Sequence, residues 1–181
     1  MDGEVIDCGH TQVMAVLTPG HTKGHLSYYF PNEDFLFTGD ICLTRVGPWY
    51  GDFDTTIDDF INAVDRIIEL KPKMLVTAHV RNFVTEDIRA KLIKYRDRIF
   101  KREERILDFL TRKAANIHEI ADERLIYRLH SSSFVLFWEK CMILQHLKRL
   151  SHRGMVEKAE DGRYSARFGT DGKSIFCGDS K

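Results

Sequence analysis

Short apolar runs separated by turn residues dominate the first eighty residues and predict β-strands. Three runs, QVMAVL, LSYYF and FLFT, occupy residues 12–17, 26–30 and 35–38. They are rich in β-branched and aromatic side chains, which favour strands. The string TPG ends the first run, and PNED separates the second from the third. We expect these strands to be antiparallel neighbours joined by short loops.

The apolar spacing changes to a helical period after a loop that contains Gly, Pro and aromatic residues. Apolar residues recur at three- and four-residue intervals over residues 57–70, which predicts an amphipathic helix. Thr56 is its expected N-cap, and Asp58 and Asp59 favour its first turn. The run MLVT at residues 74–77 then predicts a buried strand.

Helical spacing dominates the second half of the chain. A long helix is expected to start at Thr85 and to extend to about Leu110, and Asn116 is a candidate N-cap for a short helix. A third helix is expected at about 134–153, and residues 155–168 predict a hairpin that turns at Asp-Gly. This order of helices and hairpin is typical of a winged helix.

Composition indicates a soluble globular protein, because 43% of the residues are hydrophobic and 30% are charged. No apolar run approaches the roughly 20 residues that span a bilayer. The first ten residues are acidic and mixed and do not resemble a signal peptide. The four cysteines lie far apart, which favours free thiols in a reducing compartment, so a cytoplasmic location without membrane attachment is expected.

Charge divides the chain. Residues 1–80 contain 5 Lys or Arg and 12 Asp or Glu, a net charge of 5 − 12 = −7, and residues 81–181 contain 22 and 15, a net charge of 22 − 15 = +7. With the strand and helix pattern, this asymmetry predicts a first domain over 1–84, a helical domain over 85–168 and a tail over 169–181.

Polar residues follow the predicted strands at the points where strands and loops meet. His21 leads into the second strand, Asp40 ends the third, and His79 ends the fourth. Imidazoles and a carboxylate suit zinc, with iron or manganese as alternatives. Asp40 could instead cap a turn, and His79 could be a buried, hydrogen-bonded histidine. His25 is interpreted as a hydrogen-bonding support rather than as a ligand.

The strings TPGHTKGH, TGD and LVTAH, in this order around a helix, resemble the second half of the metallo-β-lactamase-fold hydrolases over Val5 to about Phe83. The resemblance implies an α/β (α+β) fold, namely the second half of an αββα sandwich with a dinuclear metal site at one edge. It implies that His21 binds one metal, that Asp40 bridges both metals, and that His79 binds the second.

Thr22 and His25 match positions that support such a site. The family's HxHxDH motif, which supplies most of the metal ligands, has no counterpart here, because His10 is the only histidine before His21. Three explanations stay open: the chain is a fragment, a half-domain or homodimer partner completes it, or it is a remnant without activity. All three predict that the chain alone is a poor hydrolase.

The resemblance therefore implies a metal-dependent hydrolase of a small-molecule ester, thioester or phosphodiester, with Asp40 as the catalytic residue that also orients the attacking water. Trp49 and Tyr50 are candidates for a substrate loop, and ordinary packing is an equal alternative for both.

The alternative function is a nucleic-acid-binding or regulatory module built on a hydrolase remnant. Its phosphate contacts would come from basic residues of the winged-helix-like domain, namely Lys148, Arg149, Arg153, Lys158, Arg163 and Arg167. A purely packing role for that domain is the favoured interpretation, because a fold alone does not assign a function.

Overall fold

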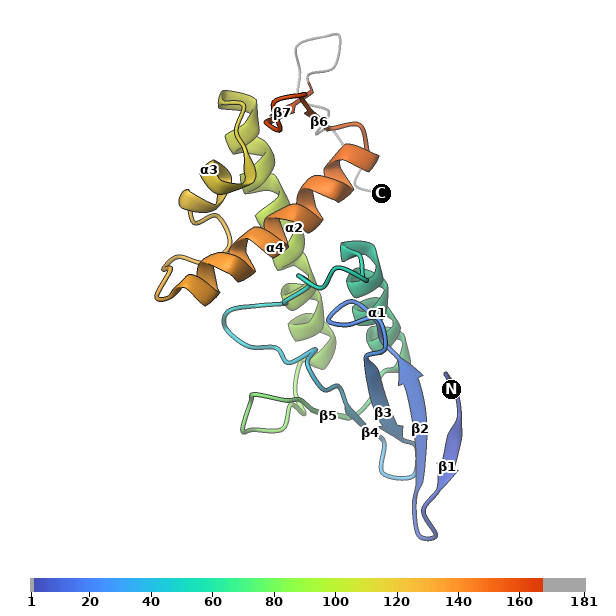
Figure 1. Cartoon of the computed structure of the whole chain (residues 1–181). Coiled ribbons are helices and arrows are strands. Elements are labelled where there is room, and N and C mark those ends of the chain that lie inside the picture. The colour runs from blue at the N-terminus through green and yellow to red at the C-terminus, as the bar shows by residue number, and fades with distance from the viewer. Residues whose placement is uncertain (1, 168–181) are drawn as a thin grey trace. The chain divides into compact units, whose positions relative to one another are not determined.

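The computed structural model describes residues 2–167, which form two compact units (Figure 1). The first unit runs to Phe100 and the second begins at Lys101. The predicted tail from residue 169 lies outside the described residues. Within residues 2–167, none of the helices is both long and apolar enough to cross a membrane.

One mixed sheet forms the centre of the first unit. Among the described residues it has five strands in the order β1-β2-β3-β4-β5. The strands from β1 to β4 pair antiparallel, and β5 pairs parallel to β4. Their bounds are Val5–Asp7 for β1, Gln12–Leu17 for β2, Leu26–Phe30 for β3, Phe35–Phe37 for β4 and Met74–Val76 for β5.

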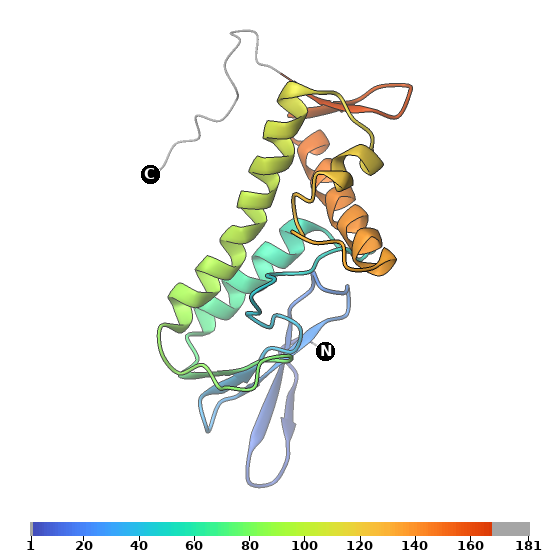
Figure 2. The ribbon, with the colours of Figure 1, turned by 90° about the vertical axis from the view of Figure 1, so that its left-hand side faces the viewer.

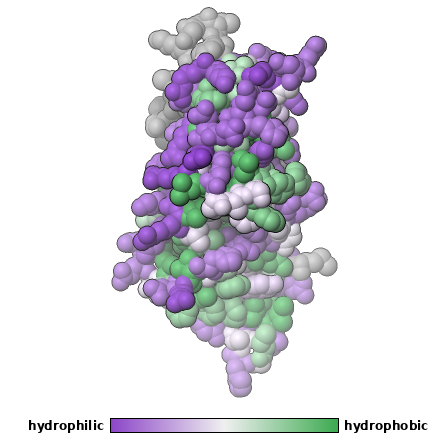
Figure 3. Space-filling model, turned by 60° about the vertical axis from the view of Figure 1, so that its left-hand side comes forward, coloured by the Kyte–Doolittle hydropathy of each residue, from purple (hydrophilic) through white to green (hydrophobic). Residues whose placement is uncertain are grey.

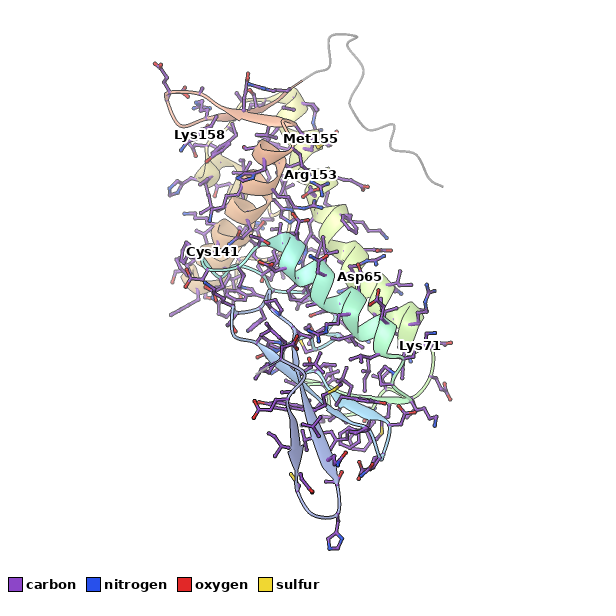
Figure 4. All side chains as sticks on the ribbon, turned by 90° about the vertical axis from the view of Figure 1, so that its right-hand side faces the viewer. Asp65, Lys71, Cys141, Arg153, Met155 and Lys158 are labelled. Carbon is purple, nitrogen blue, oxygen red and sulfur yellow. The ribbon has the colours of Figure 1, made fainter. Side chains whose placement is uncertain are left out.

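Helix α1, Ile57–Leu70, provides the crossover that the parallel pair β4 and β5 requires. Thr56 and Asp59 form a capping box at its start, as the sequence predicted for Thr56. Phe60 is fully buried. Figure 4 labels Asp65 on α1 and Lys71 at its C-terminal end, where Lys71 takes a left-handed conformation that stops the helix.

The two faces of this sheet differ in burial. Val16, Leu36 and Leu75 lie on one face and are fully buried. The opposite face carries the cross-strand row Ala15, Tyr28, Phe37 and Val76, of which all but Ala15 are only half-buried.

Leu17, on the same opposite face, is 36% exposed. Figure 3 shows apolar side chains, in green, gathered at the surface in the lower part of the view, where Figure 1 places the strands. An apolar sheet face of this kind normally packs against another layer.

Helix α2, Ile88–Arg112, begins in the first unit and continues without interruption into the second. Its first half packs against α1 (Figure 2): Tyr95 lies 6.2 Å from Phe60 between ring centroids, and Arg96 forms an ion pair with Asp65. The compact units therefore divide after Phe100 and not after residue 84, because these contacts join the start of α2 to the first unit.

The second unit contains the helical and hairpin elements that the sequence predicted. Helix α3 spans Ile117–Asp122 and is capped by Asn116, helix α4 spans Ser133–His152, and the hairpin pairs β6, Val156–Lys158, with β7, Tyr164–Ala166. Figure 4 shows the chain passing from α4 at Cys141 through Arg153 and Met155 to Lys158 in the hairpin.

Candidate metal centre

His21, Asp40 and His79 lie together at one end of the sheet, although they are distant in the sequence. His21 lies in the loop between β2 and β3, Asp40 follows β4, and His79 follows β5. The Asp40 carboxylate contacts both histidines: Oδ1 lies 2.9 Å from Nε2 of His79, and Oδ2 lies 3.6 Å from Nε2 of His21. The structure thus places the three ligand candidates in one cluster, with the carboxylate between the two imidazoles.

The cluster is open to solvent on its His79 side. The exposed fraction of the side chain is 26% for His21, 38% for Asp40 and 68% for His79. A small molecule or an ion can therefore reach the Asp40 carboxylate without unfolding the surrounding loops.

The backbone at the end of β5 holds His79 in a sparsely populated conformation. Its φ is 63°, in the left-handed region that residues other than glycine rarely adopt. The preceding Ala78 N–H donates to the Gly39 carbonyl at 2.9 Å, which joins the ends of β4 and β5. Backbone strain of this kind concentrates at functional sites, where the surrounding structure maintains it.

Two glycines permit the close approaches that form the cluster. A Cβ at Gly20 would lie 2.4 Å from the Cα of Phe60, so the loop that carries His21 contacts the α1 backbone directly. A Cβ at Gly39 would lie 2.9 Å from Nε2 of His25. Both glycines also have positive φ values, so a side chain is unfavourable at either position.

Both ring nitrogens of His25 are engaged in hydrogen bonds within the protein. The Asp40 N–H donates to its Nε2 at 3.1 Å, and its Nδ1 lies 2.9 Å from the Thr18 carbonyl oxygen, to which it donates in the neutral tautomer. Burial lowers the pKa of His25, which favours this neutral form. With Nε2 accepting and Nδ1 donating, no lone pair is left for a metal, so His25 orients the backbone of Asp40.

Thr18 and Ser27 complete this support, and the sequence did not identify either. The Thr18 hydroxyl is buried within 2.9 Å of both His25 Nδ1 and the Ser27 hydroxyl. Thr18 is the first residue of the TPGHTKGH string, and this position was the sequence feature that could have identified it as part of the site. Thr22 is exposed, and its backbone carbonyl accepts from the N–H groups of Gly20 and His25.

The two aromatic residues of the candidate substrate loop lie in different environments. Tyr50 is fully buried, with its ring centroid 6.0 Å from that of Phe60, so its side chain packs in the core and is not available to a substrate. Trp49 is half-buried beside the metal centre, with its indole 5.0 Å from the His21 ring between centroids. Packing is therefore the correct interpretation for Tyr50.

The side chains of the cluster are of types that bind divalent metals, but they are few. Among the described residues, no group of three or more His, Cys, Asp and Glu side chains is arranged to hold a metal ion. Asp40 instead forms one pair with His21 and one pair with His79. Nδ1 of His21 is buried and has no hydrogen-bond partner in residues 2–167. Neutral nitrogen with carboxylate oxygen is the chemistry of zinc, iron and manganese sites, so these residues fit one side of such a site.

Three histidines of the second unit lie next to charged side chains. Nδ1 of His118 lies 2.8 Å from the Lys140 amine, and Nε2 of His130 lies 3.6 Å from the Glu139 carboxylate. His146 is fully buried, with its Nδ1 3.4 Å from Glu103. None of these three lies in a group of metal-binding type within the described chain.

Several of the basic residues considered for phosphate contacts are engaged in ion pairs. Arg149 is buried and pairs with Glu103 at 2.5 Å, Arg163 pairs with Glu119 at 2.9 Å, and Arg167 pairs with Glu157 at 3.0 Å. These pairs reduce the positive charge that the second unit presents to an anionic partner.

Comparison with known proteins relates the first unit to one family. Residues 2–79 match the family model described as Metallo-beta-lactamase superfamily. The chain is 34% identical over 80 residues to BaeB of Bacillus velezensis, a probable polyketide biosynthesis zinc-dependent hydrolase, an alignment that covers 44% of this chain and 32% of BaeB. It is 25% identical over 138 residues to the atrochrysone carboxyl ACP thioesterase of Aspergillus chevalieri, covering 73% of this chain and 42% of the thioesterase.

A solved structure extends the similarity of fold over both units. The crystal structure of a metallo-beta-lactamase family protein from Thermus thermophilus superimposes with a TM-score of 0.78 at 24% identity, covering 92% of this chain and 53% of that chain. The chain thus spans between 32% and 53% of the lengths of these three proteins.

Proposed function

We propose that this chain carries one side of a metal-dependent hydrolase centre, because residues 2–79 match the family model of the metallo-beta-lactamase superfamily. The observation that supports this most directly is the position of Asp40, whose two carboxylate oxygens face two different imidazoles. In this proposal, Asp40, His21 and His79 are the residues of this chain that would hold the divalent metal of the centre.

Zinc is the proposed metal, with iron or manganese as alternatives, and when bound it would lower the pKa of a water molecule and polarise the scissile carbonyl or phosphoryl group. The residues of this chain then have separate tasks. Asp40 is the proposed catalytic residue, which holds the metal positions and orients the attacking water. His25 holds the backbone of Asp40 in place through the 3.1 Å hydrogen bond.

A complete centre needs further protein ligands, because a catalytic zinc usually has about three and the described residues offer two for each position. The half-exposed apolar face of the sheet supports the proposal that a second sheet packs there and supplies them. This sheet would come from another half-domain or from a second copy of the chain.

The proposed substrate is a small-molecule ester or thioester. The support is the name of one relative, a thioesterase, together with solvent access to Asp40 through the His79 side. A phosphodiester is the other hydrolysable group with a polarisable oxygen that suits such a centre. In the second unit, we propose a winged-helix-like domain that serves packing, because three of its basic residues are engaged in ion pairs.

The test of the metal site is a zinc titration that compares the wild type with Asp40→Asn. The amide keeps the shape of the side chain and removes the charge, so we expect zinc binding to be lost or weakened at least about 100-fold, beyond the usual effect of residues that only support a ligand. Asp122→Asn, an exposed carboxylate on α3, is the matched control. Equal zinc affinity of Asp40→Asn and the control would contradict the proposed function.

A further inference from the structure

The imidazole of His21 is held differently from the other imidazoles of the centre. His25 uses both nitrogens in hydrogen bonds, and Nε2 of His79 lies 2.9 Å from Asp40. Nε2 of His21 lies 3.6 Å from Asp40, beyond hydrogen-bond distance. Its Nδ1 is buried and has no hydrogen-bond partner among residues 2–167. In the described part of the chain, therefore, no hydrogen bond fixes the orientation of this ring.

The indole of Trp49 packs directly against the His21 ring. The two ring centroids are 5.0 Å apart with the planes tilted by 57°, whereas the His25 ring is farther away at 6.1 Å. Nε1 of Trp49 is buried and has no hydrogen-bond partner among the described residues. Packing, and not a hydrogen bond of its own, therefore sets the position of the indole.

The segment that follows Trp49 is anchored at two points. Tyr50, the next residue, is fully buried against Phe60 of α1. The Thr55 hydroxyl is buried and donates at 3.0 Å to the carbonyl of Gly20, the residue before His21. The loop that carries Trp49 is thus hydrogen-bonded to the backbone next to His21.

We propose that Trp49 is a positioning residue for His21, whose indole fixes the imidazole so that Nε2 faces Asp40. A metal-bound histidine normally donates its other N–H to an oxygen acceptor, which orients the ring. Here the packing of the indole against the imidazole ring takes the place of that acceptor. This inference rests on the proposed function, in which His21 is a metal ligand.

A positioning role differs in its consequences from the two other roles that Trp49 could have. A residue that only fills space would change the stability of the first unit and leave metal affinity unchanged. A residue that only contacts the substrate would change KM and leave metal affinity unchanged. Metal affinity of the folded protein is therefore the quantity that distinguishes the positioning role.

The experiment titrates Co²⁺ into the wild type, Trp49→Leu and Trp49→Phe and follows binding by visible absorption. Thermal unfolding of each protein verifies that it is folded. Trp138→Leu is the matched control, because Trp138 is the other tryptophan and is 42% exposed on α4. We expect the dissociation constant to rise about tenfold or more in Trp49→Leu and to change less than about threefold in Trp49→Phe, which keeps an aromatic face, and in the control. If Trp49→Leu does not fold, Trp49→Met, which is flexible and fills more of the space, replaces it.

An unchanged dissociation constant in folded Trp49→Leu would overturn the inference. If the wild type binds no Co²⁺, the proposed function fails, and a metal-free readout decides the inference separately. In NMR spectra without metal, we expect the His21 ring to show nuclear Overhauser contacts that define one orientation in the wild type and several in Trp49→Leu. One shared orientation in both proteins would overturn the positioning role.

Discussion

At the scale of single residues, the roles of the three site histidines follow from what each ring nitrogen contacts. His25 has a donor for one nitrogen and an acceptor for the other, so it acts through Asp40. His21 and His79 each direct Nε2 toward a different oxygen of Asp40. Under the proposed function, His25 therefore supports Asp40, and His21 and His79 are the two candidate metal ligands.

His25→Ala is expected to weaken zinc binding without abolishing it. The substitution removes the acceptor for the Asp40 N–H, so the carboxylate is held less firmly, and supporting residues of this kind typically contribute about 10–100-fold in metal affinity. The measurement is the zinc dissociation constant, with His10→Ala, an exposed histidine, as the control. A complete loss of binding, equal to that of His79→Ala, would instead identify His25 as a ligand.

The three residues of the cluster, His21, Asp40 and His79, could be predicted from the sequence because each one follows or precedes an apolar run. The supporting contacts were not predictable in the same way. Thr18 contacts His25, and Ser27 contacts Thr18, because two antiparallel strands bring these residues together, which the local sequence spacing does not show. For Tyr50 the sequence left substrate contact and packing as equal alternatives, because a polar aromatic residue in a loop has no periodic pattern that shows its burial.

At the scale of elements, the contact between the His21 loop and α1 determines how the site is assembled. Gly20 lies against the backbone of Phe60 on the first turn of α1, and the Thr55 hydroxyl binds the Gly20 carbonyl. Because backbone atoms form this contact, they have little freedom to shift when a larger residue replaces glycine. The loop and the helix are therefore a single structural unit.

Gly20→Ala is expected to destabilise the first unit by about 2–6 kcal/mol, because overpacking and a strained positive φ each cost about 1–3 kcal/mol. Gly24→Ala is the matched control in the same loop, since a Cβ there meets nothing within 4 Å, and it should change stability by less than about 0.5 kcal/mol. Chemical denaturation measures both. Equal stability of the two variants would show that the loop does not pack on α1 as described.

The elements themselves were largely predictable, because periodicity is a local property. Strands β2 and β3 and helix α1 have the predicted bounds, and Thr56 and Asn116 cap their helices as expected. Strand β1 was not predicted, because its three residues are all exposed and show no alternation. The start of α2 lies in the first compact unit through tertiary contacts with α1, which a local sequence pattern does not show.

At the scale of the whole molecule, each unit has its own stabilising centre. In the first unit it is the apolar layer between the sheet and α1. In the second, a buried polar cluster joins α2 to α4: Glu103 accepts from Arg149 at 2.5 Å and lies 3.4 Å from Nδ1 of His146. Burial lowers the pKa of His146, with Glu103 opposing this in part. Burial alone would raise the pKa of Glu103, but its hydrogen bonds to His146 and Arg149 lower it.

Both shifts predict that acid destabilises the second unit. Below the ordinary histidine pKa of about 6.5, the unfolded chain binds a proton that folded His146 excludes, so stability falls as the pH decreases from 7 toward 5. The contribution of Glu103 is present above its ordinary pKa of about 4.5 and is lost as the pH falls through its lower folded value. Thermal unfolding between pH 7 and pH 4 measures the effect.

His146→Gln should remove the part of this pH dependence between 7 and 5, and His152→Gln, at the exposed end of α4, should leave it unchanged. The same slope in all three proteins would show that the buried cluster does not determine the acid sensitivity.

The measurement that tests the central claim most directly is an NMR spectrum of the histidine ring nitrogens, recorded with and without Zn²⁺. The account predicts that Nε2 of His21 and Nε2 of His79 shift to metal-bound values, while both nitrogens of His25 keep their hydrogen-bonded values. Unchanged His21 and His79 signals at saturating Zn²⁺, or a metal-bound nitrogen on His25, would contradict it.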